Sequence, residues 1–506
     1  MGDEISHAIG RLPFLLGELL DWPAAVYPDK IAMEDETRSL TYAALLEEVL
    51  RLGRRFSEKP FGRQQRWGIN IDDPIGLIPL LLALTRVGCV GAPFRKGQPT
   101  ERLRDLFDQN EFTGVIVARE SSAAAKLGTF PDLHSVSVDK NSVAFYRHLG
   151  NSNQCGDSWA LRSVIDLDPA LIMWSSGSTR SSRGAVFQHH AVLANIWANI
   201  KALGYRDCDR TLLVLPLAHA YGLIHQCLCH LAIGGTVSIP SSPLTPPMLV
   251  RALDRFKTTT MATVPPILEL LVSGIERLGR VPATLRLVTV GAARARAACI
   301  EKLQKEMPHI QLAITYGLTE AGPRVSTNFL KPGLPDTHCV GFPLPNTEIV
   351  IRSSHGGQQE ICVRSRSAMQ SYSDLSSQAE TAGTLPTGDY GELRDGQLHV
   401  YGRLRRAVNR GGLTIPVEAI EEVLGSCPGV KLAIVEAAPH PFWGEVPIAT
   451  VYLDGSTGSV TARDLQDLCA RRLPEPERPA QIIISNEREP GPRPKEEHLL
   501  SAVVGR

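Results

Sequence analysis

The sequence lacks the features of an exported or membrane-spanning protein. Its first twenty residues, MGDEISHAIGRLPFLLGELL, have no basic start followed by an apolar core, and no later run is long and uncharged enough to span a bilayer. Its ten cysteines form no CxxC pair and no metal-like spacing with histidine, a pattern typical of reduced thiols. We therefore expect a cytoplasmic protein without a membrane span.

An excess of charge of either sign is also lacking. The 53 basic and 53 acidic residues cancel, which argues against nucleic acid or an anionic membrane as the main partner. Lysine is scarce, with 12 lysines against 41 arginines. These features favour a protein that acts on small molecules, and they leave its oligomeric state open.

The chain is long enough for at least two domains, with 506 residues of which 43% are hydrophobic. Between about residues 30 and 400, short apolar runs such as WGINI, TGVIVA, LRLVTVG and QLAITYG alternate with amphipathic stretches such as LVRALDRF and CIEKLQKEM. This alternation is typical of an α/β fold in which helices cover sheets. The segment GGQQEICVRSRSAMQSY predicts antiparallel strands in a smaller β-rich subdomain.

The last hundred residues predict a separate α+β unit. Helical patterns (VEAIEEVLGSC, ARDLQDLCARRL) and strand patterns (VKLAIVEAAP, PIATVYLD, AQIIIS) alternate there, over a length that is just sufficient for independent folding. We expect a large N-terminal domain of stacked αβ sheets over residues 1–402 and a small mobile α+β C-terminal domain over residues 403–506.

A short turn rich in glycine and hydroxyl side chains follows the apolar run LIMW. Its residues are Ser175, Ser176, Gly177, Ser178 and Thr179. Glycine allows close approach of the backbone, and hydroxyl and amide groups converge on an anion, so the composition favours phosphate binding. Because such turns are also common surface connections, the turn alone leaves both interpretations open.

Three further blocks follow in order: AITYGLTEAG, LPTGDYGEL and DGQLHVYGRLRRAVNRGGLTIPVEAIEEVL. With these four blocks, the chain resembles the adenylate-forming superfamily, most closely a stand-alone acyl- or aryl-acid CoA ligase. The resemblance covers nearly the whole chain. It implies an enzyme that uses ATP and Mg²⁺ to convert a carboxylic acid into an acyl-AMP, and then into a thioester.

The resemblance also implies roles for individual residues at an ATP site. The hydroxyl-rich turn and Arg183 would hold the β- and γ-phosphates, Tyr316 would stack on adenine, and Glu320 would bind Mg²⁺. Asp389 would accept hydrogen bonds from the ribose. The remaining residues implied at the nucleotide are Gly291, Ala292, Ala293, Gly317, Thr319 and Arg403.

Several positions depart from the family pattern. Arg180 stands where the family usually has glycine, and Arg183 where it usually has lysine; an arginine still neutralises phosphate but is larger and stiffer. Near the end of the chain, SNEREPGPRPKEEHLL places Arg493 in register with the family's catalytic lysine and Lys495 two residues later. We favour Lys495 for that role, with Arg493 as the alternative.

Two further regions carry implied roles. The resemblance places His219 as a gate beside the acid pocket, which Ala220, Tyr221, Val264 and Pro265 would help to line. It also makes Arg405 the hinge between the domains, and it assigns Gly411 and Gly412 to the passage for the thiol, although both glycines are also ordinary turn formers.

We therefore expect an AMP-forming acid–thiol ligase with ATP, a carboxylic acid and CoA as substrates. One alternative is an enzyme that loads the phosphopantetheine of a carrier protein. Another alternative is a nucleotide- or acyl-binding protein that has lost turnover through the changes at Arg180, Arg183 and Arg493. The identity of the acid is not specified by the sequence.

Overall fold

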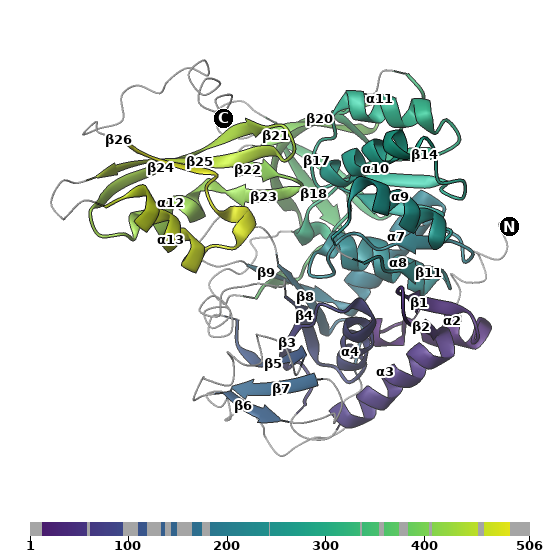
Figure 1. Cartoon of the computed structure of the whole chain (residues 1–506). Coiled ribbons are helices and arrows are strands. Elements are labelled where there is room, and N and C mark those ends of the chain that lie inside the picture. Colours follow the sequence, from purple (N-terminus) through teal and green to yellow (C-terminus); the bar gives the residue numbers. More distant parts are fainter. Residues whose placement is uncertain are drawn as a thin grey trace. The chain divides into compact units, whose positions relative to one another are not determined.

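The computed structural model describes residues 13–57, 61–94, 110–118, 133–136, 143–148, 164–174, 183–241, 243–333, 336–353, 359–373, 383–403, 407–453 and 460–485. Contacts divide these residues into two compact units, one up to Arg403 and one from Ala407 onwards (Figure 1). Within these ranges, no helix is both long and apolar enough to cross a membrane.

The larger of the two sheets in the first unit combines a parallel and an antiparallel part. Across the sheet, its strands are β17 (Thr347–Ser353), β18 (Gln359–Ser365), β20 (Leu385–Arg394), β21 (Gln397–Arg403), β16 (Cys339–Pro343), β15 (Ser326–Phe329), β14 (Gln311–Tyr316), β13 (Leu287–Val290), β12 (Thr260–Thr263), β10 (Arg210–Leu212), β11 (Thr236–Ser238), β1 (Ile31–Glu34) and β2 (Ser39–Thr41). The strands from β14 to β1 are parallel, and those from β15 to β17 are antiparallel. The antiparallel part is the predicted β-rich piece.

The second sheet of the first unit contains the strand that precedes the hydroxyl-rich turn. Its strands, in spatial order, are β19 (Ser371–Tyr372), β9 (Gly184–Gln188), β8 (Pro169–Trp174), β4 (Val90–Pro93), β3 (Arg66–Asn70), β5 (Phe112–Ala118), β7 (Val143–His148) and β6 (Leu133–Val136). Strands β4 and β12 are buried along their whole length, as expected for parallel strands covered on both faces.

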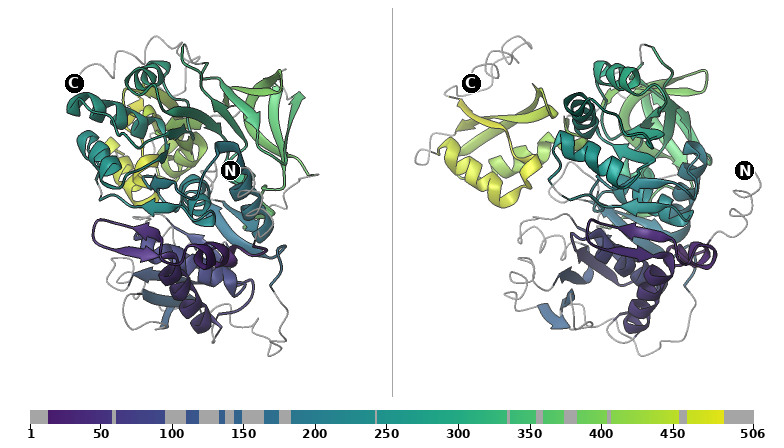
Figure 2. Two further views of the ribbon diagram at one scale, coloured as in Figure 1. Left: turned by 90° about the vertical axis from the view of Figure 1, so that its right-hand side faces the viewer. Right: turned by 45° about the vertical axis from the view of Figure 1, so that its right-hand side comes forward.

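Helices pack on these sheets through their apolar faces. They are α2 (Asp21–Val26), α3 (Tyr42–Phe56), α4 (Pro74–Arg86), α7 (His189–Leu203), α8 (Cys229–Ala232), α9 (Pro246–Arg255), α10 (Pro265–Leu278) and α11 (Ala297–Glu306), together with the non-α helices η1 (Leu16–Glu18), η3 (Tyr221–Leu228) and η4 (Thr319–Ala321). Leu253 of α9, Leu271 of α10 and Ile300 of α11 share one core with Val288 of β13. Figure 2 shows these three helices, in teal, from two further directions.

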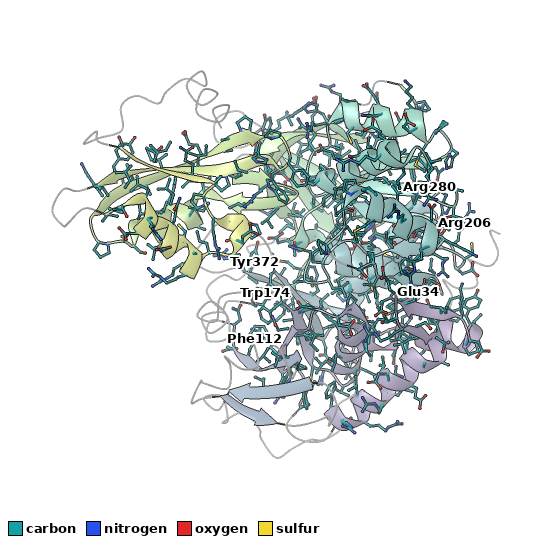
Figure 3. All side chains as sticks on the ribbon, viewed as in Figure 1. Glu34, Phe112, Trp174, Arg206, Arg280 and Tyr372 are labelled. Carbon is teal, nitrogen blue, oxygen red and sulfur yellow. The ribbon has the colours of Figure 1, made fainter. Side chains whose placement is uncertain are left out.

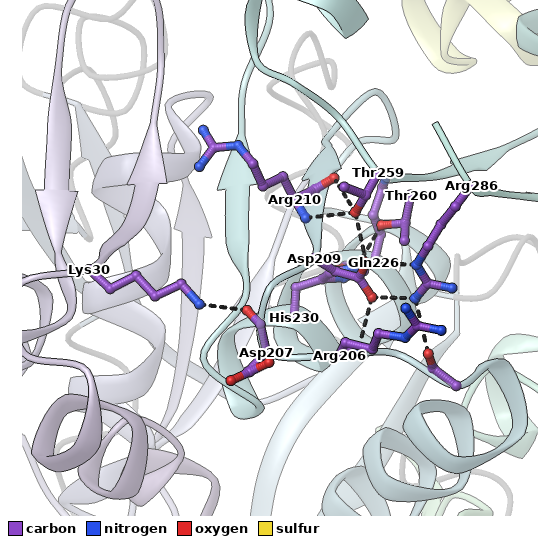
Figure 4. A network of polar contacts seen from close by, with 11 residues as sticks. Lys30, Arg206, Asp207, Asp209, Arg210, Gln226, His230, Thr259, Thr260 and Arg286 are labelled. Atoms are coloured by element: carbon purple, nitrogen blue, oxygen red, sulfur yellow. Dashed lines mark hydrogen bonds and ion pairs between the residues drawn. The ribbon is translucent and has the colours of Figure 1, made fainter. Parts of the chain in front are cut away.

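A buried polar network joins the amino ends of the parallel strands (Figure 4). Asp209 accepts a hydrogen bond from the Nε of Arg286 at 2.9 Å and another from the Thr259 hydroxyl at 2.8 Å. Burial alone would raise the pKa of Asp209, but the hydrogen bond and charge of Arg286 outweigh burial and lower that pKa. His230 contacts the Thr260 hydroxyl at 2.8 Å. The network therefore stabilises the edge of the sheet at which strands β10, β12 and β13 begin.

The second unit is a small α+β fold with its own core. Its elements are β22 (Ala407–Arg410), β23 (Leu413–Pro416), α12 (Val417–Gly425), β24 (Val430–His440), β25 (Gly444–Leu453), α13 (Ala462–Arg472), η5 (Glu475–Glu477) and β26 (Gln481–Ser485). Val408, Ile420, Val451 and Leu465 are buried together. These two units confirm the predicted fold class, while the domain boundary at 402/403 and the mobility of the C-terminal unit stay predictions.

Candidate active site

Three neighbouring parallel strands end at the same edge of the large sheet. Strand β12 ends at Thr263, β13 at Val290 and β14 at Tyr316, and the strands pair in that order. The backbone N–H of Gly291 donates to the Thr263 carbonyl at 3.0 Å, which holds the first two ends together. Ligands of α/β proteins bind beyond such carboxyl ends, so this edge is the candidate site.

Gly291 allows a close approach of side chains at this edge. A Cβ atom there would lie 2.4 Å from the Thr315 Oγ1 and 3.2 Å from the Tyr221 Cζ, so a larger residue would displace both. The next residue, Ala292, is exposed and has a positive φ of 66°. Ala293 follows it at the surface-facing start of the loop before α11. The backbone of this loop is therefore accessible to a flat ligand.

Tyr316 and Asp389 form a close pair although 73 residues separate them. The Tyr316 hydroxyl donates to the Asp389 Oδ2 at 2.6 Å, the short distance expected for a hydrogen bond to a carboxylate. The Asp389 side chain is largely buried. Arg403 stands opposite Asp389 in the β20/β21 register. The structure thus brings together three of the residues predicted at the nucleotide.

Glu320 lies in η4, directly after Tyr316, Gly317 and Thr319 along the chain. Its Oε1 accepts a hydrogen bond from the Tyr372 hydroxyl at 3.3 Å, and its carbonyl accepts one from the Met369 N–H at 2.8 Å. The Arg183 guanidinium lies 5.1 Å from the centre of the Tyr372 ring, within range of a cation–π interaction. Figure 3 labels Tyr372 and, beside it, Trp174, the last described residue before the hydroxyl-rich turn. The Glu320 carboxylate and the Arg183 guanidinium therefore both contact Tyr372.

The predicted acid-pocket residues form the adjoining part of this edge. His219 lies in the turn before η3, and its carbonyl accepts the Leu223 N–H at 2.9 Å. Ala220 is buried and precedes Tyr221, the first residue of η3. Val264 is the N-cap residue of α10, and Pro265 is its first residue. The structure brings Tyr221 into contact with the Gly291 position, whereas the role of His219 beside the acid stays a prediction.

Hydroxyl groups anchor Tyr221 in its place. Its hydroxyl lies 3.1 Å from the Thr289 Oγ1 and 3.2 Å from the Thr315 Oγ1. Burial raises the pKa of Tyr221, so the phenol stays neutral. The sequence analysis missed both threonines and Tyr372, because a hydroxyl residue within a strand gives no signal of its own. Tyr372 was present in the predicted strand segment AMQSY, but its partner strand β9 is distant in sequence.

In the second unit, Gly411 and Gly412 form the two-residue turn of the β22/β23 hairpin. Their φ values are 57° and 88°, and a two-residue turn with positive φ at both positions favours glycine strongly. The Gly411 N–H donates to the Trp443 carbonyl at 2.7 Å. Their role in a thiol passage stays a prediction.

The other predicted site residues lie outside the described residues. These are Ser175, Ser176, Gly177, Ser178, Thr179, Arg405, Arg493 and Lys495, together with the side chain of Arg403. Among the described residues, no group of three His, Cys, Asp or Glu side chains gathers as a metal site. A metal ion at Glu320 would therefore take further oxygen ligands from substrate and water.

Comparisons with known proteins identify the family. Residues 20–373 match the family described as AMP-binding enzyme, and residues 419–490 match its C-terminal domain. The chain is 24% identical over 93% of its length to an oxalate–CoA ligase of Arabidopsis thaliana, covering 95% of that protein. It is 25% identical over 92% of its length to a 2-succinylbenzoate–CoA ligase of Bacillus cytotoxicus, covering 93% of that protein.

A third relative, 4-coumarate–CoA ligase-like 6 of Arabidopsis thaliana, is 30% identical over 56% of this chain, and the match spans about half, 53%, of that protein. Among solved structures, the amide bond synthetase McbA from Marinactinospora thermotolerans has a TM-score of 0.80 at 22% identity, over 95% of this chain and 97% of that one, which supports the fold. The family match extends over well more than half of the chain. The chain therefore belongs to the AMP-binding enzyme family.

Proposed function

We propose that this enzyme activates a carboxylic acid with ATP and then transfers the acyl group to the thiol of CoA. A carboxylate oxygen attacks the α-phosphorus, pyrophosphate leaves, and the thiol sulfur then attacks the acyl carbon of the acyl-AMP and releases AMP. The observation that supports this most is the hydrogen bond between Tyr316 and Asp389 at the carboxyl end of β14, the strand that pairs with β13, with Glu320 four residues after Tyr316 in the chain.

The residues at this edge fit a nucleotide. Asp389 is a carboxylate that accepts a hydrogen bond from the Tyr316 hydroxyl, and a carboxylate is the kind of acceptor that the hydroxyls of a ribose require. Gly291 and the exposed Ala292 leave backbone groups open to a flat base. We propose that Tyr316 stacks on that base, with Gly317 and Ala293 beside it and Thr319 at the α-phosphate.

Glu320 fits a magnesium ion that the phosphates complete. It is a hard oxygen donor at partial exposure, and Mg²⁺ in proteins is usually held by one or two carboxylates plus substrate phosphates and water. When bound, the ion would neutralise charge on the departing pyrophosphate. Arg183, held over Tyr372, contributes a permanent positive charge near the same carboxylate. Ser175 to Thr179 would close over the outer phosphates, and Lys495 or Arg493 would supply charge at the attacking carboxylate.

The acid would bind beside Tyr221 and Gly291, with His219, Ala220, Val264 and Pro265 around it. Relatives of this chain include ligases for oxalate, 4-coumarate and 2-succinylbenzoate, so these three acids belong in the first test panel. CoA is the proposed acceptor, and a carrier-protein phosphopantetheine is the alternative. The nine described cysteines are free thiols, which supports a reducing, cytoplasmic setting.

The test is acid-dependent pyrophosphate release from ATP and Mg²⁺, followed by detection of the thioester by mass spectrometry with CoA or with a carrier protein as acceptor. One acid that gives both pyrophosphate and acyl-CoA supports the proposal. Pyrophosphate with thioester only on the carrier protein supports the alternative acceptor. ATP binding without turnover of any acid contradicts the proposal.

Matched variants test the residue roles. Glu320→Gln removes the charge proposed for Mg²⁺, and Glu301→Gln removes an exposed carboxylate from α11 as its control. We expect Glu320→Gln to lower kcat and raise the Mg²⁺ concentration required, with Glu301→Gln unchanged. Lys495→Ala and Arg493→Ala, compared in the same assay, distinguish the two candidates for the catalytic cation.

A further inference from the structure

The loop after β13 carries an arginine that reaches a distant strand. Arg294 follows directly after Gly291–Ala293, the residues whose backbone faces the base in the proposed function. Its Nη2 donates to the Val400 carbonyl at 2.9 Å and to the Tyr401 carbonyl at 3.2 Å. These two acceptors belong to β21 and lie 106 and 107 residues further along the chain. One guanidinium group therefore joins the loop to β21.

Strand β21 contains a β-bulge at the point where the guanidinium binds. Across the β20/β21 pair, Tyr390 lies opposite Gly402. The next residue, Gly391, lies opposite Val400, so Tyr401 is an extra residue in β21. A bulge disrupts the ladder, bends its strand and changes the direction of the side chains that follow. The guanidinium therefore supplies donors to the carbonyls of the extra residue and of the residue before it.

Strand pairing on the other side of β21 stops at the same place. Strand β16 begins at Cys339, which pairs with His399, one residue before Val400. Before β16, the His338 carbonyl accepts the Val400 N–H at 2.9 Å, and the His338 Nε2 lies 3.3 Å from the Arg294 Nη1. Contacts from the arginine and from this histidine therefore replace strand pairing beside the bulge.

The bulge precedes the strand end that carries the residues proposed for the ribose. Two residues after it, β21 ends at Arg403, which lies opposite Asp389. Asp389 accepts the Tyr316 hydroxyl at 2.6 Å and is the carboxylate proposed to bind the ribose. The direction in which β21 leaves the bulge therefore affects where this end of the strand pair lies. A guanidinium is suited to fixing that direction, because hydrogen bonds from a charged donor are stronger than neutral ones.

We propose that Arg294 is a positioning residue for the nucleotide. It ties the loop that would face the base to the bulge of β21, and it thereby fixes that loop relative to Asp389, the acceptor for the ribose. Arg294 acts through these two segments and takes part in no chemical step. This inference rests on the proposed function, because it concerns how the same ATP site is held together.

The test compares ATP with 2′-deoxy-ATP, which lacks one of the two hydroxyls proposed to bind Asp389. The readout is kcat and KM for acid-dependent pyrophosphate release by the wild type, Arg294→Met and Arg294→Lys, with the KM for the acid measured alongside. Arg296→Met is the matched control, because Arg296 lies two residues further along and pairs with Glu269 at the surface. Urea denaturation shows whether each variant is folded.

The wild type should prefer ATP to 2′-deoxy-ATP. Arg294→Met should raise the KM for ATP by about 10-fold, the loss expected when hydrogen bonds from a charged group disappear, and it should affect 2′-deoxy-ATP less. The preference for ATP should therefore shrink, with the KM for the acid unchanged. Arg294→Lys, which keeps the charge, should retain part of the preference, and Arg296→Met all of it. In the Asp389→Asn background, Arg294→Met should change the preference little.

Several results would overturn the inference. One is a folded Arg294→Met protein that keeps the wild-type preference for ATP. Another is an equal loss with both nucleotides, which a purely structural role would produce. If Arg294→Met does not fold, an unchanged preference in Arg294→Lys overturns the inference. Equal use of both nucleotides by the wild type also overturns it, because no grip on the ribose would then need positioning. No pyrophosphate release with any acid refutes the proposed function itself.

Discussion

The hydrogen bond between Tyr316 and Asp389 offers the sharpest test of the candidate site. Tyr316→Phe removes the hydroxyl and keeps the ring, so the largely buried carboxylate loses a donor at 2.6 Å. A hydrogen bond to a charged group contributes about 1.5–3 kcal/mol, and a buried acceptor that loses its partner costs a similar amount. We expect Tyr316→Phe to lower the free energy of unfolding by about 2 kcal/mol.

The assay is urea denaturation within a double-mutant cycle that includes Asp389→Asn. Because both changes act on one contact, Tyr316→Phe should cost much less in the Asp389→Asn background than in the wild type. Tyr401→Phe is the matched control, since the Tyr401 hydroxyl donates to a carboxylate, Glu392, at the surface, where water replaces the lost donor.

Two results would refute this reasoning. One is a Tyr316→Phe protein that unfolds at the wild-type urea concentration. The other is an equal cost of Tyr316→Phe with and without Asp389→Asn. For function, Tyr316→Phe should leave the KM for ATP close to the wild-type value because the ring remains, whereas Tyr316→Ala should raise it. A large KM change in Tyr316→Phe would mean that the hydroxyl, and not the ring, contacts the nucleotide.

Further predictions concern stability and the second half-reaction. Burial lowers the pKa of His189 to about 4 from 6.5, and its Nδ1 accepts the Leu16 N–H, so stability should be lost as the pH falls from 6.5 towards 4. Relative to His189→Gln, that loss should be about 3 kcal/mol in urea titrations at the two pH values. Asp209→Asn should cost about 3 kcal/mol in urea denaturation because it leaves the partly buried Arg286 guanidinium without its carboxylate partner, and Asp209→Asn with Arg286→Met should cost less. Gly412→Ala, at a φ of 88°, should destabilise the second unit by about 1–2 kcal/mol, and thioester formation should slow more than pyrophosphate release if the hairpin lines the thiol passage. Equal slowing of both half-reactions would contradict that role.

Much of the fold was predictable because apolar periodicity is a local property. The predicted order of helix, strand, strand, helix and strand in the last hundred residues matches α12, β24, β25, α13 and β26. The pairing of strands that are distant in sequence was harder to predict. The segment that ends in Tyr372 was interpreted as one antiparallel set, but β18 joins the large sheet and β19 pairs with β9 of the other sheet. The apolar run TLLVLPL at 211–217 also favours a strand by its composition, but only its first two residues belong to β10, and the chain then turns at Pro216 towards His219.

The site could be predicted only where sequence blocks mark it. Tyr316 and Asp389 were assigned to one nucleotide by resemblance, and the structure places them in direct contact. Thr289 and Thr315 had no such block, and their hydroxyls became recognisable only through their distances to Tyr221. The role of a polar residue within a strand depends on the residues that it contacts in neighbouring elements. These contacts exist only in the folded protein.

Arg324 shows most clearly why burial has to come from the structure. In the sequence TEAGPRVSTNF, an arginine after proline resembles a solvated loop residue, and composition makes arginine common in this chain. Its enclosure results because Asn199 of α7 and His225 of η3, which lie 125 and 99 residues before it in the sequence, meet it beside the adjacent strand β15. Burial of this kind depends on contacts that only the folded chain makes, and no local pattern in the sequence predicts it.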